Sequence, residues 1–284
     1  MGTFMTEYCE LCGSYMYGDG SRIDIGQGVA AWACQQCKDD TKQRRDSTMT
    51  RINKWAIKAI KKCLLLAGVR DKKAPLPPCF LALANQIIAE RRTMLGIDRL
   101  YMLWQCVMNA PAGSNVLEVG VYKGGSAAFL AWTLVHRGNG GHLVAADTFT
   151  GHAVVDPSVD GAHEVNKGFA DVDFEDVRTY LTHVPTVTVV KGDITKAWIS
   201  LGKERDLGFV HVDVDVYPAT LAALRYAENR LLPGGTIICD DYGFTTCRGV
   251  RKAVDEFIAE NVGWQKLDLG TGQVLIRKVL EGIH

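Results

Sequence analysis

The sequence predicts an α/β protein with a Rossmann-like, seven-stranded, mostly parallel sheet, preceded by a small zinc ribbon and a helical cap. Three observations predict it. Short β-rich runs alternate with helical runs beyond Pro111, apolar residues recur at steps of three and four over residues 81–109, and two CxxC pairs stand near the N-terminus. We expect a zinc ribbon over residues 1–45, a helical linker and cap over 46–110, and the Rossmann-like domain over 111–284.

The CxxC pairs supply the first element. Cys9 and Cys12 form one pair, and Cys34 and Cys37 form the other, so that four thiolates could surround one Zn²⁺. The glycine-rich segment between them suits a short hairpin, and we expect a structural zinc site. Four unrelated thiols are the alternative, and a redox CxxC is disfavoured because no βαβ pattern surrounds either pair.

A basic segment follows the cysteines. Residues 38–62 contain nine Lys or Arg and three Asp, and their spacing fits an amphipathic helix. A solvated helix face is the simpler interpretation. An anionic partner, such as a carrier protein, a nucleotide-bearing substrate or RNA, is the alternative. Pro75, Pro77 and Pro78 then mark a boundary before the helical pattern of residues 81–109.

Beyond Pro111 the alternation predicts a parallel sheet with helices on both faces. Strands are predicted over residues 115–120, 142–147, 186–191, 209–214 and 236–239, and helices over residues 126–136, 174–183, 219–232 and 248–261. Two last strands, 264–269 and 273–277, are joined by a tight glycine-containing link and should add an antiparallel edge. Ligands of such sheets bind at the carboxyl ends of the strands.

Composition sets limits on function. The 284 residues carry 32 Lys plus Arg and 32 Asp plus Glu, and they are 47% hydrophobic and 23% charged. These values exclude a disordered or fibrous chain, and without a basic excess we expect no nucleic acid partner. The longest apolar stretches, residues 63–69 and 127–135, are too short to span a membrane. Because residues 1–13 show no secretory pattern, we expect a cytoplasmic protein.

The ends of the first three strands predict the cofactor. The first strand runs through Glu118 into a glycine-rich turn that contains Gly120 and Tyr122 and leads to Ser126 at the start of a helix. The turn lacks the G-x-G-x-x-G pattern of dinucleotide-binding proteins. Asp147, followed by Thr148, ends the second strand and could accept from two ribose hydroxyls.

The third strand is followed by Asp193 and Ile194, where Asp193 could face an adenine amine. A single strand-end Asp is more often a helix cap. A glycine loop and two acids in this order instead indicate S-adenosylmethionine bound across a class I methyltransferase sheet.

The fourth and fifth strands end in four acidic residues. If the strand alternation continues, Asp213 and Asp215 project to one side, and Asp240 and Asp241 end the neighbouring strand. Like charges at such spacing need protons or a cation, and oxygen ligands favour Mg²⁺, with Mn²⁺ or Ca²⁺ as alternatives. Helix caps and surface carboxylates are the simpler interpretation.

The motifs together resemble the macrocin O-methyltransferase family, whose members methylate hydroxyls of antibiotic sugars such as those of mycinamicin and novobiocin. The similarity spans residues 81–278 and includes the motifs RTMLG from Arg92, DTFTG from Asp147, DVDVY from Asp213 and DDYG from Asp240. The resemblance implies that Asp213, Asp240 and Asp241 hold a divalent metal and that Asp215 is the catalytic base. It also implies that Thr93 and Met94 help to cover the cofactor. We expect Asp213 to contact the cofactor as well as the metal.

We therefore expect an S-adenosylmethionine-dependent, divalent-metal-dependent O-methyltransferase acting on a hydroxyl of a sugar or natural product. A vicinal diol is favoured, because a divalent cation lowers the pKa of a hydroxyl beside it and two adjacent oxygens chelate well. The expected partner is a small-molecule acceptor, and we expect a homo-oligomer. The alternatives are methylation of RNA or a carrier-bound substrate, and a non-enzymatic adaptor.

The segment between Thr148 and Phe174 is polar and should form a mobile lid that excludes water. It contains His152 and His163. A solvated loop position is the favoured interpretation of each histidine, and a second catalytic base is the alternative.

Overall fold

The computed structural model describes four short strands near the N-terminus and residues 76–164, 168–184, 186–196 and 206–279, with the side chains of residues 161–164 left out. The chain divides into two compact units, Met1–Gln86 and Ile87–His284. The proposed zinc ligands Cys9, Cys12, Cys34 and Cys37 and the basic segment 38–62 lie outside the described residues.

The first unit contains two short antiparallel pairs. Strand β1 (Glu7–Tyr8) pairs with β2 (Tyr15–Met16), and β3 (Ser21–Asp24) pairs with β4 (Ala30–Ala33). The hairpin predicted between the two cysteine pairs is therefore present as β3 and β4.

The predicted helical run of residues 81–109 forms two helices, α3 (Pro78–Ala89) and α4 (Ile97–Asn109). Arg91 adopts a left-handed conformation with φ 56°, which a continuous helix excludes, and Gly96 caps the start of α4. Helix α4 buries one apolar face, including Leu100 and Leu103. The seven residues between the helices form a segment that reaches the candidate site described below.

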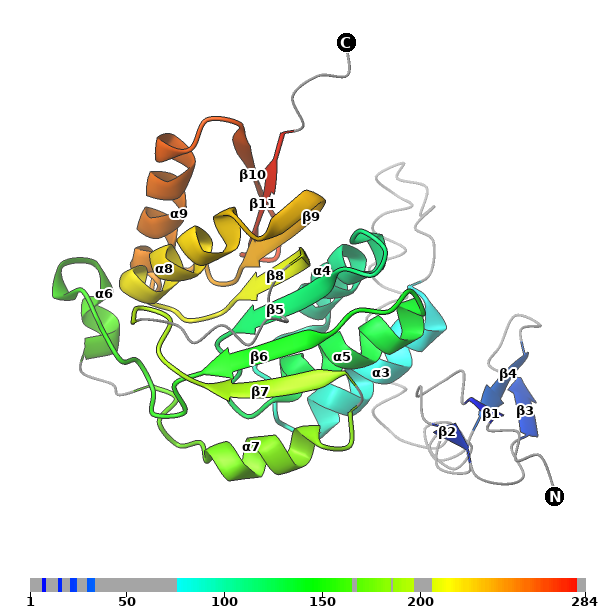
Figure 1. Ribbon diagram of the computed structural model, residues 1–284. Coiled ribbons are helices and arrows are strands. Elements are labelled where there is room, and N and C mark those ends of the chain that lie inside the picture. Colours follow the sequence, from blue (N-terminus) through cyan, green and yellow to red (C-terminus); the bar gives the residue numbers. More distant parts are fainter. Residues whose placement is uncertain are drawn as a thin grey trace, which may run out of the picture. The chain divides into compact units, whose positions relative to one another are not determined.

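The second unit is built on a seven-stranded sheet in the order β10-β11-β9-β8-β5-β6-β7 (Figure 1). Its strands are β5 (Asn115–Val119), β6 (Leu143–Asp147), β7 (Val187–Lys191), β8 (Leu207–Val212), β9 (Leu231–Cys239), β10 (Trp264–Asp268) and β11 (Val274–Lys278). The pairings among β7, β6, β5, β8 and β9 are all parallel. The chain order reverses between β5 and β8, which creates a ligand-binding crevice at their carboxyl ends.

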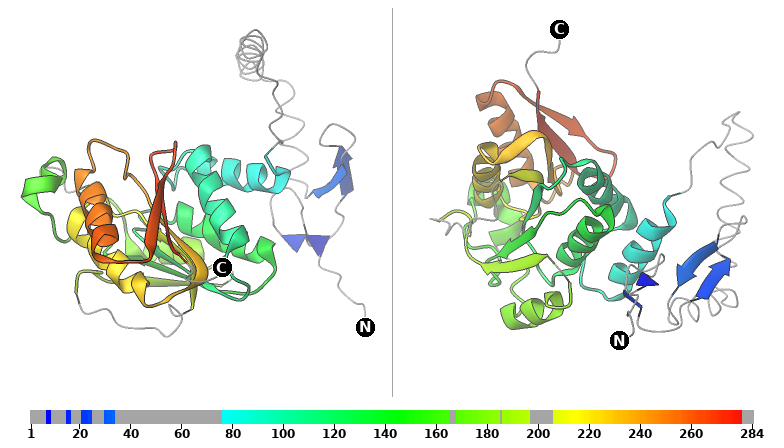
Figure 2. Two further views of the ribbon diagram at one scale, coloured as in Figure 1. Left: turned by 90° about the horizontal axis from the view of Figure 1, so that it is seen from above. Right: turned by 45° about the vertical axis from the view of Figure 1, so that its right-hand side comes forward.

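Helices cover both faces of the sheet, as predicted. They are α5 (Gly125–Arg137), α6 (Pro157–Glu164), α7 (Phe174–Leu181), α8 (Tyr217–Glu228) and α9 (Arg248–Glu260). Figures 1 and 2 show α8 and α9 on one face and α4 and α5 on the other. Alternate residues of each strand therefore face different helices. Leu117 and Val210 pack in the core under α8 and α9, while their neighbours Glu118 and His211 do not belong to it.

The two final strands form the expected hairpin and the expected antiparallel edge. Strand β11 lies between β9 and β10 and runs antiparallel to both. Burial explains this order, because β11 buries Val274 and Ile276 completely, while β10 is exposed at every residue after Trp264. No helix within the described residues has both the length and the apolarity needed to cross a membrane.

Candidate active site

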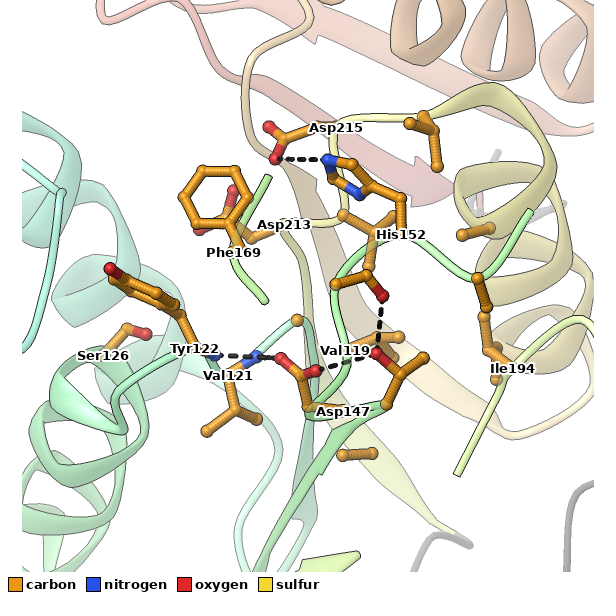
Figure 3. A pocket seen from close by; sticks show the side chains of 18 of the residues that line it. Val119, Val121, Tyr122, Ser126, Asp147, His152, Phe169, Ile194, Asp213 and Asp215 are labelled. Carbon is orange, nitrogen blue, oxygen red and sulfur yellow. Dashed lines mark hydrogen bonds and ion pairs between the residues drawn. The ribbon is translucent and has the colours of Figure 1, made fainter. Parts of the chain in front are cut away.

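A cavity of about 220 Å³ opens at the carboxyl ends of β5, β6, β7 and β8. Most of the predicted cofactor residues line it, and Figure 3 shows how several of them face the same space. The predicted residues that line the cavity are Thr93, Met94, Gly120, Tyr122, Ser126, Asp147, Thr148, Asp193, Ile194, Asp213, Asp215 and Asp241. The fold therefore brings together residues from six separate segments of the chain.

The loop after β5 requires its first glycine. Gly120 has φ +93°, and a Cβ built there would lie 1.9 Å from the carbonyl oxygen of Asp213. The absence of a side chain therefore lets the ends of β5 and β8 meet.

Asp147 fixes the next part of this loop. Its Oδ2 accepts from the backbone N–H groups of Val121 and Tyr122, at 2.7 and 2.9 Å (Figure 3). Its Oδ1 accepts from the N–H of Phe149 at 2.7 Å. These bonds use most of the acceptor capacity of the carboxylate. Its predicted contact with two ribose hydroxyls stays a prediction, and any such contact must share the carboxylate with the loop.

The segment between α3 and α4 forms another wall. The N–H of Gly125 donates to the carbonyl of Arg92 at 3.1 Å, and a Cβ at Gly125 would lie 2.6 Å from the carbonyl carbon of Arg92. This close approach holds Thr93 beside the start of α5. Met94, by contrast, is 72% exposed, and its predicted role in covering the cofactor stays a prediction.

Asp193 and Ile194 follow β7 on the opposite side of the cavity. The Oδ1 of Asp193 accepts from the backbone N–H and the hydroxyl of Thr195, at 3.0 and 2.7 Å, and its Oδ2 lies 3.2 Å from Lys196 Nζ. The carboxylate thus closes a local turn, while Ile194 supplies an apolar wall.

An acid cluster lies at the tips of β8 and β9. Asp213, Asp240 and Asp241 each bring one carboxylate oxygen to within 4.8 Å of the others. The backbone places them there, because Asp213 N–H donates to Val119 at 2.8 Å and Asp240 N–H donates to Val212 at 2.8 Å. Residues at the ends of two adjacent parallel strands therefore converge as the sequence predicted.

Asp215 reaches the same region by a different route from the one predicted. Strand β8 ends at Val212, so strand alternation cannot align Asp213 with Asp215. Instead, Asp215 adopts φ 62° in a tight turn, where Val216 N–H donates to the Val214 carbonyl at 2.7 Å. A left-handed aspartate is uncommon, and such residues concentrate at functional sites.

The charges of the cluster are poorly balanced. Burial, reinforced by the charge of Asp240, raises the pKa of Asp213 well above its ordinary value. Burial and the hydrogen bond with Asp215 raise the pKa of Asp241 to about 8, and burial raises the pKa of Asp215. Neutralisation by protons or by a cation would relieve this repulsion. The carboxylates of Asp213, Asp240 and Asp241 therefore fit a divalent cation that prefers oxygen ligands.

Arg99, which the sequence analysis missed, contacts this cluster from α4. Its Nη1 donates to Asp240 Oδ2 and lies 3.3 Å from Asp241 Oδ1, while its Nη2 donates to the Met94 carbonyl at 2.9 Å. Burial alone would lower the pKa of Arg99, but Asp240 and Asp241 raise it. An arginine on an amphipathic helix gives no signal of such a contact.

Glu118 does not line the cavity. It is fully buried on the other side of the strand and lies 2.9 Å, through Oε1, from Nδ1 of the buried His211. The Nε2 of His211 lies 3.8 Å from Asp240 Oδ1, which also accepts from Gln273 Nε2 at 2.6 Å. Burial alone would lower the pKa of His211, but Asp240 and Glu118 raise it to about 10. Glu118 therefore belongs to a buried network behind Asp240, and its predicted place beside the cofactor does not match this geometry.

His152 lies close to Asp215 and is largely shielded from solvent, so its interpretation as a solvated loop residue is wrong. Its side chain is 8% exposed, and its Nε2 lies 3.9 Å from Asp215 Oδ2 (Figure 3). Phe169 packs edge-on against His152, with ring centroids 5.8 Å apart. Cys247, also missed from the sequence, donates from Sγ to Asp215 Oδ1 at 3.8 Å. The side chain of His163 lies outside the described residues.

The sequence matches the Macrocin-O-methyltransferase (TylF) family over residues 38–267. The chain belongs to this family. The motifs recognised in the sequence begin at residue 81, but the family match begins at residue 38. The match to the macrocin O-methyltransferases therefore includes the basic segment 38–62. The four N-terminal cysteines precede it. As a member of this family, the protein is an O-methyltransferase.

Individual O-methyltransferases are also similar to this chain in sequence. The chain is 30% identical over 197 residues to the 8-demethyl-8-(2,3-dimethoxy-alpha-L-rhamnosyl)-tetracenomycin-C 4'-O-methyltransferase of Streptomyces olivaceus, covering 61% of this chain and 75% of the relative. It is 28% identical over 205 residues to the mycinamicin III 3''-O-methyltransferase of Micromonospora griseorubida, covering 61% and 78%. The demethyldecarbamoylnovobiocin O-methyltransferase of Streptomyces niveus is 29% identical over 189 residues, covering 61% and 70%.

Solved structures share the fold. The O-methyltransferase NovP superposes with a TM-score of 0.57 at 22% identity, covering 66% of this chain and 83% of NovP. The calicheamicin methyltransferase CalS11 superposes with a TM-score of 0.50 at 19% identity, covering 72% and 87%.

Proposed function

We propose that the protein transfers a methyl group from S-adenosylmethionine to a hydroxyl of a sugar or sugar-bearing natural product, assisted by a divalent cation such as Mg²⁺. The observation that carries this proposal is the convergence of Asp213, Asp240 and Asp241 beside the cavity that the Gly120 loop lines. The names of the relatives support it, because they specify O-methylation of a rhamnosyl tetracenomycin, of mycinamicin III and of demethyldecarbamoylnovobiocin.

We assign the methyl donor to the side of the cavity formed by the ends of β5, β6 and β7. S-adenosylmethionine supplies a methyl group that is already activated by its positively charged sulfur. The Gly120 loop lines this side of the cavity, Ile194 provides an apolar wall, and Thr93 and Met94 would cover the donor. The four carboxylates at the tips of β8 and β9 favour a positively charged ligand nearby.

We assign the acceptor hydroxyl to the side near Asp215. When bound, a divalent cation lowers the pKa of a hydroxyl beside it and orients that hydroxyl. Asp213, Asp240 and Asp241 would hold the cation. Asp215 would accept the hydroxyl proton. His152 and Phe169 would limit the access of water to Asp215.

The test is transfer of a labelled methyl group from S-adenosylmethionine to the acceptors named for the relatives, with Mg²⁺ and with a chelator. We expect Asp215→Asn to lower turnover by about 100-fold or more, because it removes the proton acceptor. Its affinities for S-adenosylhomocysteine and Mg²⁺, measured by calorimetry, should stay within about twofold of wild type. The exposed edge-strand variant Asp268→Asn is the matched control and should keep normal turnover.

Two results would count against the proposal. Near-normal turnover of Asp215→Asn would remove the role of this residue as the base. Undiminished turnover after complete chelation would remove the cation from the reaction and leave a metal-independent methyltransferase.

A second candidate is methylation of RNA or a carrier-bound substrate. It is favoured by the nine basic residues of segment 38–62, which lies within the family match. It predicts salt-dependent retention of RNA in a filter-binding assay, and neutralising Lys58, Lys61 and Lys62 together should abolish that retention. Retention that is absent at low salt would exclude the RNA form of this candidate.

A further inference from the structure

The guanidinium of Arg99 occupies the same carboxyl groups that the proposed cation site uses. Its Nη1 contacts both Asp240 and Asp241, which are two of the three proposed cation ligands. Both interactions are shielded from solvent, since the side chain of Asp240 is fully buried and those of Arg99 and Asp241 are each 17% exposed. Shielding makes charge interactions stronger than at a protein surface.

Arg99 is held in this position from other sides as well. Its Nη2 donates to the carbonyl of Met94 at 2.9 Å, and its guanidinium lies 5.7 Å from the centroid of the Phe244 ring. The side chain therefore joins the segment that covers the proposed cofactor site to the tip of β9. An arginine fixed by two separate segments, one at Met94 and one from Asp240 to Phe244, is a built part of the site and not a loosely paired surface charge.

Its charge is too small to balance the site. Asp213, Asp215, Asp240 and Asp241 can together carry four negative charges, and Arg99 supplies one positive charge. The positive charge of His211 beside Asp240 is balanced by the buried Glu118 on its other side. Arg99 therefore neutralises part of the cluster and leaves an excess that still favours a divalent cation. Because Asp240 and Asp241 cannot give the same lone pairs to a guanidinium and a metal ion, the two cations compete.

We propose that Arg99 is a positioning residue that acts as an internal competitor of the divalent cation: it holds Asp240 and Asp241 together in the metal-free enzyme and weakens metal binding. This inference rests on the cation site of the proposed function. It makes an unusual prediction, because loss of a purely structural contact should weaken metal binding, whereas loss of a competitor should strengthen it.

The experiment is calorimetric titration of the full chain with MgCl₂ in wild type, Arg99→Met, Arg99→Lys and Arg92→Met. We expect the affinity of Arg99→Met for Mg²⁺ to be about tenfold or more above that of wild type. Residues next to metal ligands change metal affinity by factors of this size. Arg99→Lys should lie near wild type, because it keeps the charge. Arg92→Met is the matched control, since Arg92 lies just before α4 but pairs with the exposed Asp176, and the Mg²⁺ affinity of this variant should be unchanged.

Thermal unfolding supplies an independent readout. With a chelator present, Arg99→Met should unfold at a lower temperature than wild type, because the carboxylates then repel without compensation. Saturating Mg²⁺ should raise its midpoint by more than it raises that of wild type.

Equal or weaker Mg²⁺ binding by Arg99→Met, in a protein whose wild type binds Mg²⁺, would overturn the competition and leave the proposed function standing. Absence of Mg²⁺ binding in both wild type and Arg99→Met would instead overturn the cation site itself, and the inference with it.

Discussion

Binding of Mg²⁺ should depend steeply on pH below about pH 8. In the absence of the cation, burial, the bond to Asp215 and the charge of Asp240 raise the pKa of Asp241 to about 8. A metal ligand must be deprotonated, so a proton has to leave Asp241 when the cation binds. With a pKa of 8, about 1% of the carboxyl groups are ionised at pH 6 and about half at pH 8, so the apparent affinity should rise about 50-fold over this interval.

Calorimetric titrations at pH 6, 7 and 8 measure this rise directly. Repeating each titration in two buffers of different ionisation enthalpy gives the number of protons released, which should be at least one per Mg²⁺ at pH 6. Because the pKa of Asp213 is also raised, a second proton can contribute. Asp241→Asn should bind Mg²⁺ more weakly and with a flatter pH profile. An affinity that is constant from pH 6 to 8, with no proton release, would refute the electrostatic account of the cluster.

The same pKa fixes the sign of a stability effect. Asp241 holds its proton more tightly in the folded protein than in the unfolded chain, where its pKa is near the ordinary value of 3.8. Its contribution to the free energy of unfolding is therefore fully present below pH 4 and is lost as the pH rises to about 8. In a chelator, the protein should become less stable across this interval, and saturating Mg²⁺ should reduce the loss.

Three further predictions concern other parts of the chain. Gly120→Ala should prevent the normal junction of β5 and β8, since its Cβ would meet the Asp213 carbonyl at 1.9 Å, and soluble yield and unfolding midpoint should both fall. Asp160→Ala should destabilise the protein by about 1–3 kcal/mol in urea unfolding, because the buried Asp160 carboxylate accepts from the N–H of Tyr217 at the start of α8 at 3.0 Å. If the CxxC pairs form the expected zinc site, elemental analysis should find about one Zn²⁺ per chain, and Cys34→Ser should lose it; purified protein without zinc would contradict that expectation.

The sequence by itself determined the order in which strands and helices follow one another along the sheet domain. It also determined which strands end in acidic residues. Apolar runs with a period of two or of three to four residues mark these elements, because each must bury one face. Parallel strands end at one edge of the sheet, so the positions of Asp147, Asp193, Asp213, Asp240 and Asp241 sufficed to predict that a polar site lies there.

Only the tertiary structure decided which groups these carboxylates meet. Arg99 reaches Asp240 from a helix 141 positions earlier in the chain, and Glu118 lies against His211, 93 positions later. His152 reaches Asp215 from the segment after β6. Local spacing describes which face of a strand or helix a residue occupies, but not which distant element packs against that face. The partners, and with them the charge balance of the site, therefore follow from the packing of helices and loops on the finished sheet.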